Sequence, residues 1–238
     1  AITCSASPST TTSRWRIYDD SPAGAFARTL FDDARQSQVI ETLGESTYNG
    51  FQLLTSDGRP WNNTSQFVLQ WSMQYPEAVI VYVEVRTDAG IRYLQYMPID
   101  DDPLGSGEYV VFGIGKDAAT DGRWRTYMRD LESDLQRAQP GVEIFSVDSF
   151  LVRGTGRVDD IILLGRGSDS DGDRLNDYDE FNTYHTNPHS TDTDGDGLFD
   201  GDEVLIYETI PTAADTEMDG LNDGEELFPT SLRPPTDP

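Results

Sequence analysis

Apolar and polar side chains alternate along several segments between residues 14 and 165, and this pattern predicts β strands. In residues 67–75 every second side chain is apolar, which is typical of a half-buried strand. In residues 79–87 valines alternate with polar or aromatic residues, and a hairpin turn at 87–90 leads into a return strand at 91–97. Weaker versions of the pattern predict further strands at 15–19, 35–43, 48–54, 108–114, 142–152 and 158–164.

The number and spacing of these segments predict a mainly β fold class. Residues 124–136 have mixed periodicity and fit either another strand or a short helix. Eight or more strands separated by turn residues favour an antiparallel β-sandwich or jelly roll over residues 14–165. Residues 1–13 are rich in Ser and Thr, so we expect a disordered N-terminal segment there.

Residues 169–235 follow a different pattern, in which an acidic motif occurs three times. The copies begin at residues 169, 192 and 215, so the period is 23 residues. Each copy has carboxylates at its first, third, fifth, ninth and twelfth positions and leucine at its seventh. A proline follows the twelfth position by eight residues, which limits any helix there to one or two turns. A fixed period indicates a stacked array of small units that do not fold alone.

The spacing of these carboxylates fits a calcium-binding loop. Ca²⁺ takes about six to eight oxygen ligands, and a twelve-residue loop supplies them from alternate positions, a backbone carbonyl at the seventh position and a two-oxygen Glu at the twelfth. We expect about three to five Ca²⁺ ions in the array. The candidate ligands are Asp169, Asp171, Asp173, Leu175, Asp177 and Glu180 in the first copy, Asp192, Asp194, Asp196, Leu198, Asp200 and Glu203 in the second, and Asp215, Glu217, Asp219, Leu221, Asp223 and Glu226 in the third.

Two of the three copies depart from this pattern. Arg174 occupies the turn position where glycine is expected, and a residue with a Cβ is strained there if φ is positive. Glu217 replaces Asp at the third position of the last copy, so its longer side chain has to fold back. We therefore expect the middle loop to be the best formed.

Residues 169 to about 235 resemble bacterial thrombospondin type 3 calcium repeats, through the stretches DSDGDRLNDYDE, DTDGDGLFDGDE and DTEMDGLNDGEE. The resemblance implies that these carboxylates hold calcium, that the array is a spacer, and that the protein is secreted or lies on a cell surface. Dockerin modules use similar loops but follow each with a long helix, which the prolines oppose. EF-hands need a helix before each loop, whereas residues 161–164 read as a strand and 165–168 as a hinge.

Charge and composition exclude several classes of partner. The net charge of −26 argues against nucleic-acid binding. Of the 43 acidic residues, 20 lie in residues 169–238 beside two arginines, so without cations this segment repels itself. No apolar run approaches the ~18 residues of a membrane span.

Cys4 is the only cysteine, which rules out an internal disulfide framework. A lipid-modified Cys4 is left as an open alternative.

A second, looser resemblance covers about 150 residues of the β domain. It is similar to a noncatalytic carbohydrate-binding jelly roll of the galactose-binding-like kind, through residues 49–51, Trp71, 121–124, 129–131 and 153–161. The resemblance implies a glycan ligand and one structural calcium near the ends of the domain, for which Asp160 with Asp19 or Asp20 are the candidates. The alternative is that these aspartates only cap strand ends.

Candidate glycan ligands lie on the face opposite the valine core, because sugars stack on aromatic rings and hydrogen-bond to planar polar groups. The first set is Tyr82, Glu84 and Arg86, with Tyr93 and Gln95 on the next strand. The second set is Trp124, Arg125, Arg129 and Arg153. Arginines in an acidic protein favour an anionic ligand such as an acidic polysaccharide. The alternatives are core packing for the tryptophans and salt bridges to Asp130, Asp134 or Asp148 for the arginines.

An enzyme is disfavoured, because both histidines lie in the repeats and the β domain has no histidine to act as general base. We therefore expect no catalytic residues, and a noncatalytic secreted or surface module that binds a polysaccharide and is followed by a calcium-rigidified spacer. We expect a monomer that is linked to other domains in a larger protein. The alternatives are a calcium-dependent adhesin with a protein partner and part of a polysaccharide-degrading hydrolase or lyase.

Overall fold

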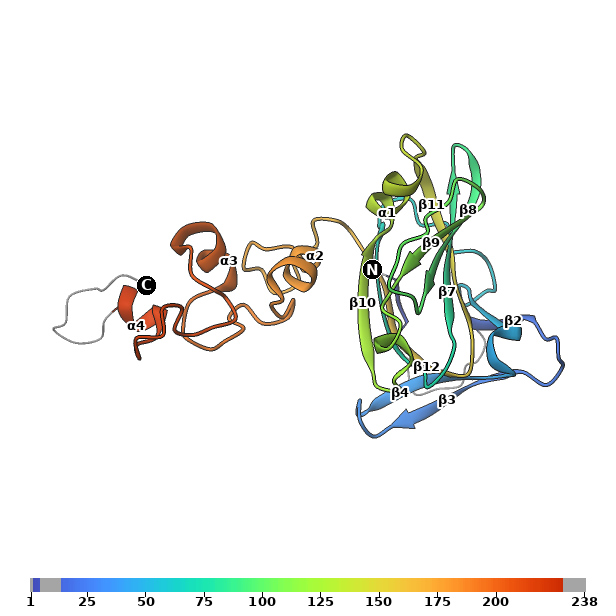
Figure 1. Cartoon of the computed structure of the whole chain (residues 1–238), viewed down its shortest axis with the longest axis horizontal. Coiled ribbons are helices and arrows are strands. Elements are labelled where there is room, and N and C mark those ends of the chain that lie inside the picture. The colour runs from blue at the N-terminus through green and yellow to red at the C-terminus, as the bar shows by residue number, and fades with distance from the viewer. Residues whose placement is uncertain (1, 5–13, 229–238) are drawn as a thin grey trace. The chain divides into compact units, whose positions relative to one another are not determined.

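Two six-stranded sheets form the N-terminal unit, which comprises residues 1–165, and a second compact unit comprises residues 166–238 (Figure 1). The structure is a computed structural model that describes residues 2–4 and 14–228. Among these residues, no helix has both the length and the apolar character that crossing a membrane requires.

The first sheet has the order β10-β6-β12-β4-β3, and β1 also pairs with β12. Its strands are β1 (Ile2–Cys4), β3 (Phe26–Asp32), β4 (Ser37–Leu43), β6 (Val68–Gln74), β10 (Arg125–Asp130) and β12 (Gly156–Leu164). All pairs in this sheet are antiparallel.

The second sheet has the order β2-β5-β11-β7-β8-β9. Its strands are β2 (Trp15–Asp19), β5 (Gly50–Leu53), β7 (Ile80–Thr87), β8 (Gly90–Met97), β9 (Tyr109–Gly113) and β11 (Ile144–Arg153). Its pairs are antiparallel except β8 with β9, which is parallel. The predicted mainly β sandwich is therefore confirmed, with one parallel pair at the edge of this sheet.

The hydrophobic core lies between the sheets and fixes which side chains face outward. Val81, Val83 and Val85 of β7 are fully buried, as the alternating pattern predicts. Trp71 of β6 is also fully buried and stacks on Tyr127 with ring centroids 5.2 Å apart. Because successive strand residues point to opposite faces, the residues between the valines lie on the outer face of the second sheet.

Two segments differ from the prediction. Residues 124–136 were predicted to form either a strand or a short helix, and they contain both. Strand β10 ends at Asp130, and helix α1 (Leu131–Ala138) begins directly after it. Asp130 caps this helix by accepting a hydrogen bond from the Ser133 N–H at 3.1 Å. Strand β3 was not predicted, because it is an edge strand whose two faces are both partly exposed and show no clear alternation.

The N-terminal segment also differs from the prediction in part. Residues 2–4 form strand β1, with Ile2 opposite Leu163 and Cys4 opposite Ile161 in the register with β12, although disorder was predicted for 1–13. Residues 1 and 5–13 lie outside the described residues, as does the side chain of Cys4, for which lipid modification was left as an open alternative.

In the second unit each described repeat consists of an acidic loop followed by a short helical segment. These segments are α2 (Asp177–Asp179) with η4 (Glu180–Tyr184), α3 (Asp200–Asp202) with η5 (Glu203–Tyr207), and α4 (Asp223–Leu227). The first two end at His185 and Glu208, both left-handed with φ of 61°. The helices therefore have one to two turns, as predicted. Residues 229–235, the predicted end of the array, lie outside the described residues.

Candidate functional site

The first carboxylate of each acidic loop holds the loop closed. In the second repeat Asp192 accepts hydrogen bonds from the Gly195 N–H at 2.7 Å and the Gly197 N–H at 3.1 Å. Asp169 does the same in the first repeat. The sixth position has positive φ in every loop, and Arg174 takes φ of 89° there, so the predicted backbone strain at this residue is confirmed.

Carboxylates of the first half of each loop converge, as the spacing predicts. Oxygen atoms of Asp169, Asp171 and Asp173 lie within 4.8 Å of one another. Those of Asp192, Asp194 and Asp196 form the equivalent cluster in the second repeat. Each cluster offers the oxygen ligands that Ca²⁺ prefers.

A second type of cluster joins neighbouring repeats. Asp173 and Glu180 of the first repeat cluster with Asp200, the ninth residue of the second repeat. The sequence predicts Asp200 as a ligand in its own loop, whereas its carboxylate also lies beside those of the preceding repeat. Thr193 of the same loop holds this carboxylate, by donating to it from N–H at 2.8 Å and from Oγ at 2.6 Å.

The same arrangement recurs one repeat further on. Asp196 and Glu203 of the second repeat cluster with Asp223 of the third, and Thr216 holds Asp223 as Thr193 holds Asp200. In the first repeat Ser170 holds the equivalent Asp177, which belongs to no metal-type cluster among the described residues. The ninth-position carboxylates of the second and third repeats, Asp200 and Asp223, therefore lie beside carboxylates of the preceding repeat, and Asp223 also belongs to a cluster of its own loop.

The third loop differs from the other two. Its cluster joins Asp215 and Glu217 to Asp223, and Asp219 takes no part in it. Met218 has a φ of 61° at a position where the other loops have glycine. The Glu217 departure thus changes the ligand set, in line with its longer side chain. Of the seventh-position leucines, Leu175 and Leu198 are buried, whereas Leu221 is half-buried, and their carbonyl groups remain predicted ligands.

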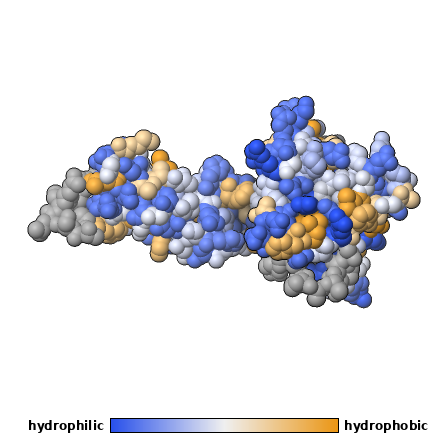
Figure 2. All heavy atoms as spheres, turned by 90° about the horizontal axis from the view of Figure 1, so that it is seen from below, coloured by the Kyte–Doolittle hydropathy of each residue, from blue (hydrophilic) through white to orange (hydrophobic). Residues whose placement is uncertain are grey.

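Unpartnered oxygen atoms in these clusters fit a bound cation. Asp171 Oδ2, Glu180 Oε2, Asp194 Oδ2 and Glu203 Oε2 are buried and have no hydrogen-bond partner. Burial, together with neighbouring carboxylates, raises the pKa of Glu180 and of Glu203 to about 8. A cation would supply the missing partner and cancel the repulsion. Figure 2 shows mostly hydrophilic residues on the visible face of the repeat unit, at the left.

These raised pKa values predict how the calcium-free repeat unit responds to pH. The pKa of Glu180 and Glu203 in the fold, about 8, lies above the ordinary value of 4.5, so ionisation opposes folding. Their contribution to stability is fully present below about pH 4.5 and is lost as the pH rises through about 8. We expect the residual helical signal of the calcium-depleted chain to be strongest near pH 4.5 and to fall as the pH rises through about 8, as measured by circular dichroism. A signal that rises with pH there would contradict the assignment.

Among the described residues, the predicted calcium ligands of the β domain, Asp160 and Asp19, do not share a cluster of possible metal ligands. Asp160 pairs with Arg35 and accepts from Ser72 Oγ at 3.2 Å, whereas Asp19 pairs with Arg153 at 2.7 Å. Asp160 and Asp19 lie on strands of different sheets. All metal-type clusters among the described residues lie between Asp169 and Asp223.

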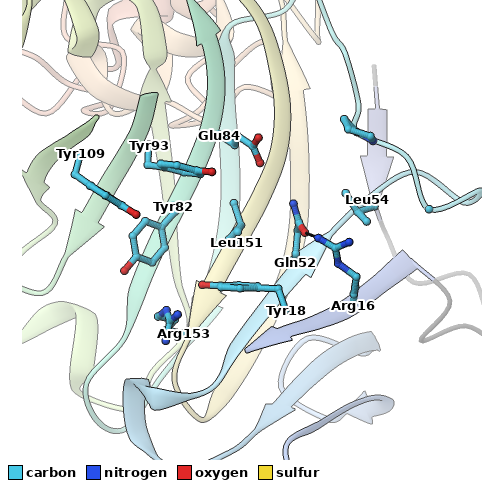
Figure 3. A pocket seen from close by; sticks show the side chains of 12 residues that line it. Arg16, Tyr18, Gln52, Leu54, Tyr82, Glu84, Tyr93, Tyr109, Leu151 and Arg153 are labelled. Atoms are coloured by element: carbon cyan, nitrogen blue, oxygen red, sulfur yellow. Dashed lines mark hydrogen bonds between the residues drawn. The ribbon is translucent and has the colours of Figure 1, made fainter. Parts of the chain in front are cut away.

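A groove of about 450 Å³ lies on the outer face of the second sheet (Figure 3). Tyr93 of β8 and Tyr109 of β9 stack with ring centroids 5.3 Å apart, and Tyr82 of β7 meets Tyr109 edge-on at 6.5 Å. Figure 3 shows these three rings at one end of the groove and Arg16 with Gln52 at the other. The lining residues are Arg16, Tyr18, Gln52, Leu54, Gly58, Pro60, Tyr82, Glu84, Tyr93, Tyr109, Leu151 and Arg153.

Tyr18, Tyr82 and Tyr93 of the groove remain hydroxyl donors at neutral pH. Burial raises the pKa of Tyr18 to about 12 although Arg153 lowers it. Burial also raises the pKa values of Tyr82 and Tyr93, and near Tyr93 the carboxylate of Glu84 adds to the effect. The groove thus presents flat apolar faces together with oriented polar groups, which is the composition of a ligand site.

Some predicted glycan ligands line this groove and others do not. Tyr82, Glu84, Tyr93 and Arg153 line it, because the register pairs Glu84 with Tyr93 across β7 and β8. Gln95 lies opposite Tyr82 and hydrogen-bonds to its side chain.

Four predicted ligands, Arg86, Trp124, Arg125 and Arg129, are placed elsewhere. Arg86 pairs with the buried Asp148 at 2.9 Å outside the groove lining. Arg125 and Arg129 are on β10 of the other sheet and pair with Asp121 and Asp134, each at 2.6 Å. The Trp124 ring packs against Arg35 with the guanidinium carbon 4.7 Å from the ring centroid. The salt-bridge alternative thus holds for Arg86 and Arg129.

Sequence reasoning missed several residues of the groove, among them Arg16, Tyr18, Gln52 and Tyr109. Arg16 and Tyr18 alternate with the inward residues of β2, so their outward direction was readable. The sequence did not predict that β2 pairs with β5 and that β5 pairs with β11. This pairing places Arg16 and Tyr18 in the same groove as Glu84.

Comparisons with known proteins give two kinds of likeness. No curated protein sequence matches the chain. A family 11 carbohydrate-binding module of the cellulosomal cellulase Lic26A-Cel5E of Clostridium thermocellum is similar in structure with a TM-score of 0.39 and 12% identity, over 68% of this chain and 93% of that chain. A xylan-binding domain of family 22 is similar with a TM-score of 0.36 and 12% identity, over 66% of this chain and 90% of that chain. The model of the bacterial TSP3 repeat family matches residues 169–191 and 192–209, so these residues form two repeats of that family.

Proposed function

We propose that the N-terminal unit is a noncatalytic module that binds a polysaccharide in the groove of the second sheet. The observation that carries this proposal is the convergence of Tyr18, Tyr82, Tyr93 and Tyr109 from four strands in one groove. Sugar rings present apolar C–H faces that pack on aromatic rings and hydroxyl groups that hydrogen-bond to polar side chains. An open groove that crosses several strands suits a chain of sugars better than a single one.

The chemistry of the lining supports binding without cleavage. A retaining glycosidase needs two carboxyl groups about 5–5.5 Å apart. Among the residues that line the groove, Glu84 alone carries a carboxylate. The enzyme alternative predicts new reducing ends or unsaturated uronates after incubation with polysaccharides, and their appearance at catalytic rates would replace our proposal.

The repeat unit is proposed to be a spacer held rigid by calcium. The described clusters provide for up to five ions, three within loops and two between repeats. Extracellular calcium modules bind with Kd of roughly 10⁻⁴–10⁻³ M, which calcium outside the cell satisfies. We therefore propose a secreted or cell-surface protein, monomeric and linked to further domains, in which the spacer sets the distance of the binding module from them.

The proposed function is tested by removing one tyrosine of the groove. Tyr109 is about half exposed at 53%, so Tyr109→Ala leaves the core intact. We expect a loss of about 2 kcal/mol in binding free energy, roughly 30-fold in Kd, because a groove aromatic contributes apolar area to the ligand. Isothermal titration calorimetry with xylan, mixed-linkage β-glucan and acidic polysaccharides measures the effect.

The matched control is Tyr48→Ala. Tyr48 is an exposed tyrosine of the same unit, and its side chain does not line the groove, so binding is expected to stay unchanged. Equal affinities of the wild type and Tyr109→Ala for every bound polysaccharide would exclude the groove as the site.

A further inference from the structure

One chain of hydrogen bonds crosses the floor of the groove from β2 to β7. The Arg16 guanidinium donates to Gln52 Oε1, and Gln52 Nε2 donates to Ser149 Oγ at 2.9 Å. The Ser149 hydroxyl donates to Glu84 Oε2 at 2.9 Å. Gln52 is 7% exposed and Ser149 is fully buried, so the chain is part of the packed sheet and holds both charged ends in place.

The two charges at the ends of this chain have no partner of opposite sign among the described residues. The other groove cation, Arg153, pairs with Asp19 at 2.7 Å and also donates to the carbonyl groups of Thr47 and Tyr48. Arg16 is exposed, and its hydrogen bond to Gln52 uses a single donor of the guanidinium, which has five N–H donors in a planar fork. The remaining donors match the geometry of a carboxylate or sulfate.

The opposite end of the groove suits a neutral sugar. Glu84 accepts a hydrogen bond there and would repel an anion, while Tyr82, Tyr93 and Tyr109 present their rings beside it. Three strand intervals separate β2 from β7 in the sheet order, which is about 14 Å at ~4.8 Å per interval. This separation fits different residues of one oligosaccharide.

We propose that the groove selects an acidic polysaccharide, a proposal that rests on the proposed function. The oxyanion of one sugar binds Arg16, and a neutral sugar ring packs on the tyrosines at the Glu84 end. Arg16 is then the residue that determines specificity for charged over neutral chains. The charged sugar of the bound chain then lies at the β2 edge of the sheet.

The test uses the full chain in calcium with oligosaccharides too short to gel. The probes are a glucuronoxylan oligosaccharide, which carries one carboxylate beside neutral xylose rings, and its carboxyl-reduced form, and an oligosaccharide of sulfated galactan and its desulfated form. We expect at least one acidic probe to bind about tenfold more tightly than its neutral counterpart, with a preference that weakens as salt is added. The pair that shows the preference distinguishes carboxylate from sulfate.

Variants of Arg16 separate selectivity from binding. Arg16→Gln is expected to remove the preference while binding of the neutral probe persists, and Arg16→Lys is expected to retain part of it as a point charge. Arg28→Gln is the matched control, because Arg28 is an exposed arginine paired with Glu41 on the other sheet. Circular dichroism verifies that each variant is folded.

The outcomes distinguish the two proposals. Equal affinity of the wild type for acidic and neutral probes, or a preference that survives in Arg16→Gln, overturns the role of Arg16 and leaves polysaccharide binding intact. Absence of binding to any acidic or neutral polysaccharide overturns both.

Discussion

Removal of calcium is expected to unfold the repeat unit while the β unit stays folded. Of the apolar side chains described in residues 166–228, only Leu175, Leu198 and Pro211 are buried. The interior is instead made of carboxylates such as Glu180, Glu203 and Asp223, which repel one another without a cation. We therefore expect metal binding and folding to be one process in this unit.

Circular dichroism and small-angle scattering in calcium and in EGTA measure this change. We expect the scattering to show an expanded segment in EGTA and the β signal to persist. A matched pair of variants then tests the assigned ligands. Glu203→Gln is expected to lower calcium affinity about tenfold or more, whereas Glu208→Gln, an exposed carboxylate outside the clusters, should change it little. A repeat unit that stays compact in exhaustive EGTA would refute the calcium role.

The second large effect is expected from Gly201→Ala, at the contact between the first two repeats. A Cβ on Gly201 would lie 2.0 Å from the backbone oxygen of Asp173, a distance that forces the backbone apart. The Gly201 N–H also donates to Asp173 Oδ2 at 2.9 Å, so the same shift separates Asp200 from its cluster. We expect the free energy of unfolding of the repeat unit to fall by about 3 kcal/mol or more, because the cost of overpacking adds to the loss of the site shared by the two repeats.

Urea denaturation in saturating calcium and a calcium titration measure the two parts of this effect. The control is Gly167→Ala in the same unit, because no atom lies within 4 Å of its added Cβ and its φ is not in the left-handed region. Equal stability of Gly201→Ala and the control would show that the repeats do not pack through this contact.

Much of the repeat unit could be predicted from the sequence, because each ligand lies within twelve residues of the next and local spacing determines the loop. The sharing of Asp200 and Asp223 could not, since it depends on how repeats stack. A sequence signal for it exists at the tenth position, which is glycine in the second and third copies but Tyr178 in the first, where no described repeat precedes it.

Only some of the residues that line the groove could be predicted from the sequence. Alternation about the valines of β7 identified Tyr82 and Glu84, and the tight hairpin to β8 added Tyr93. Arg129 is of a residue type that often binds anionic ligands, yet it pairs with Asp134. Asp134 lies one turn into helix α1, and the sequence did not show that this helix begins directly after β10. Long-range strand pairing decides such cases, and it is not encoded in local periodicity.

The aspartates that bridge successive repeats would couple the occupancy of neighbouring calcium sites. An ion held by Asp173, Glu180 and Asp200 would fix the start of the second repeat and so position Asp196 and Glu203 for the next ion. We therefore expect calcium binding to be cooperative along the array, as in a one-dimensional lattice with nearest-neighbour coupling. Such a lattice stiffens over a narrow range of free calcium concentration, so the reach of the spacer would respond sharply to its ionic surroundings.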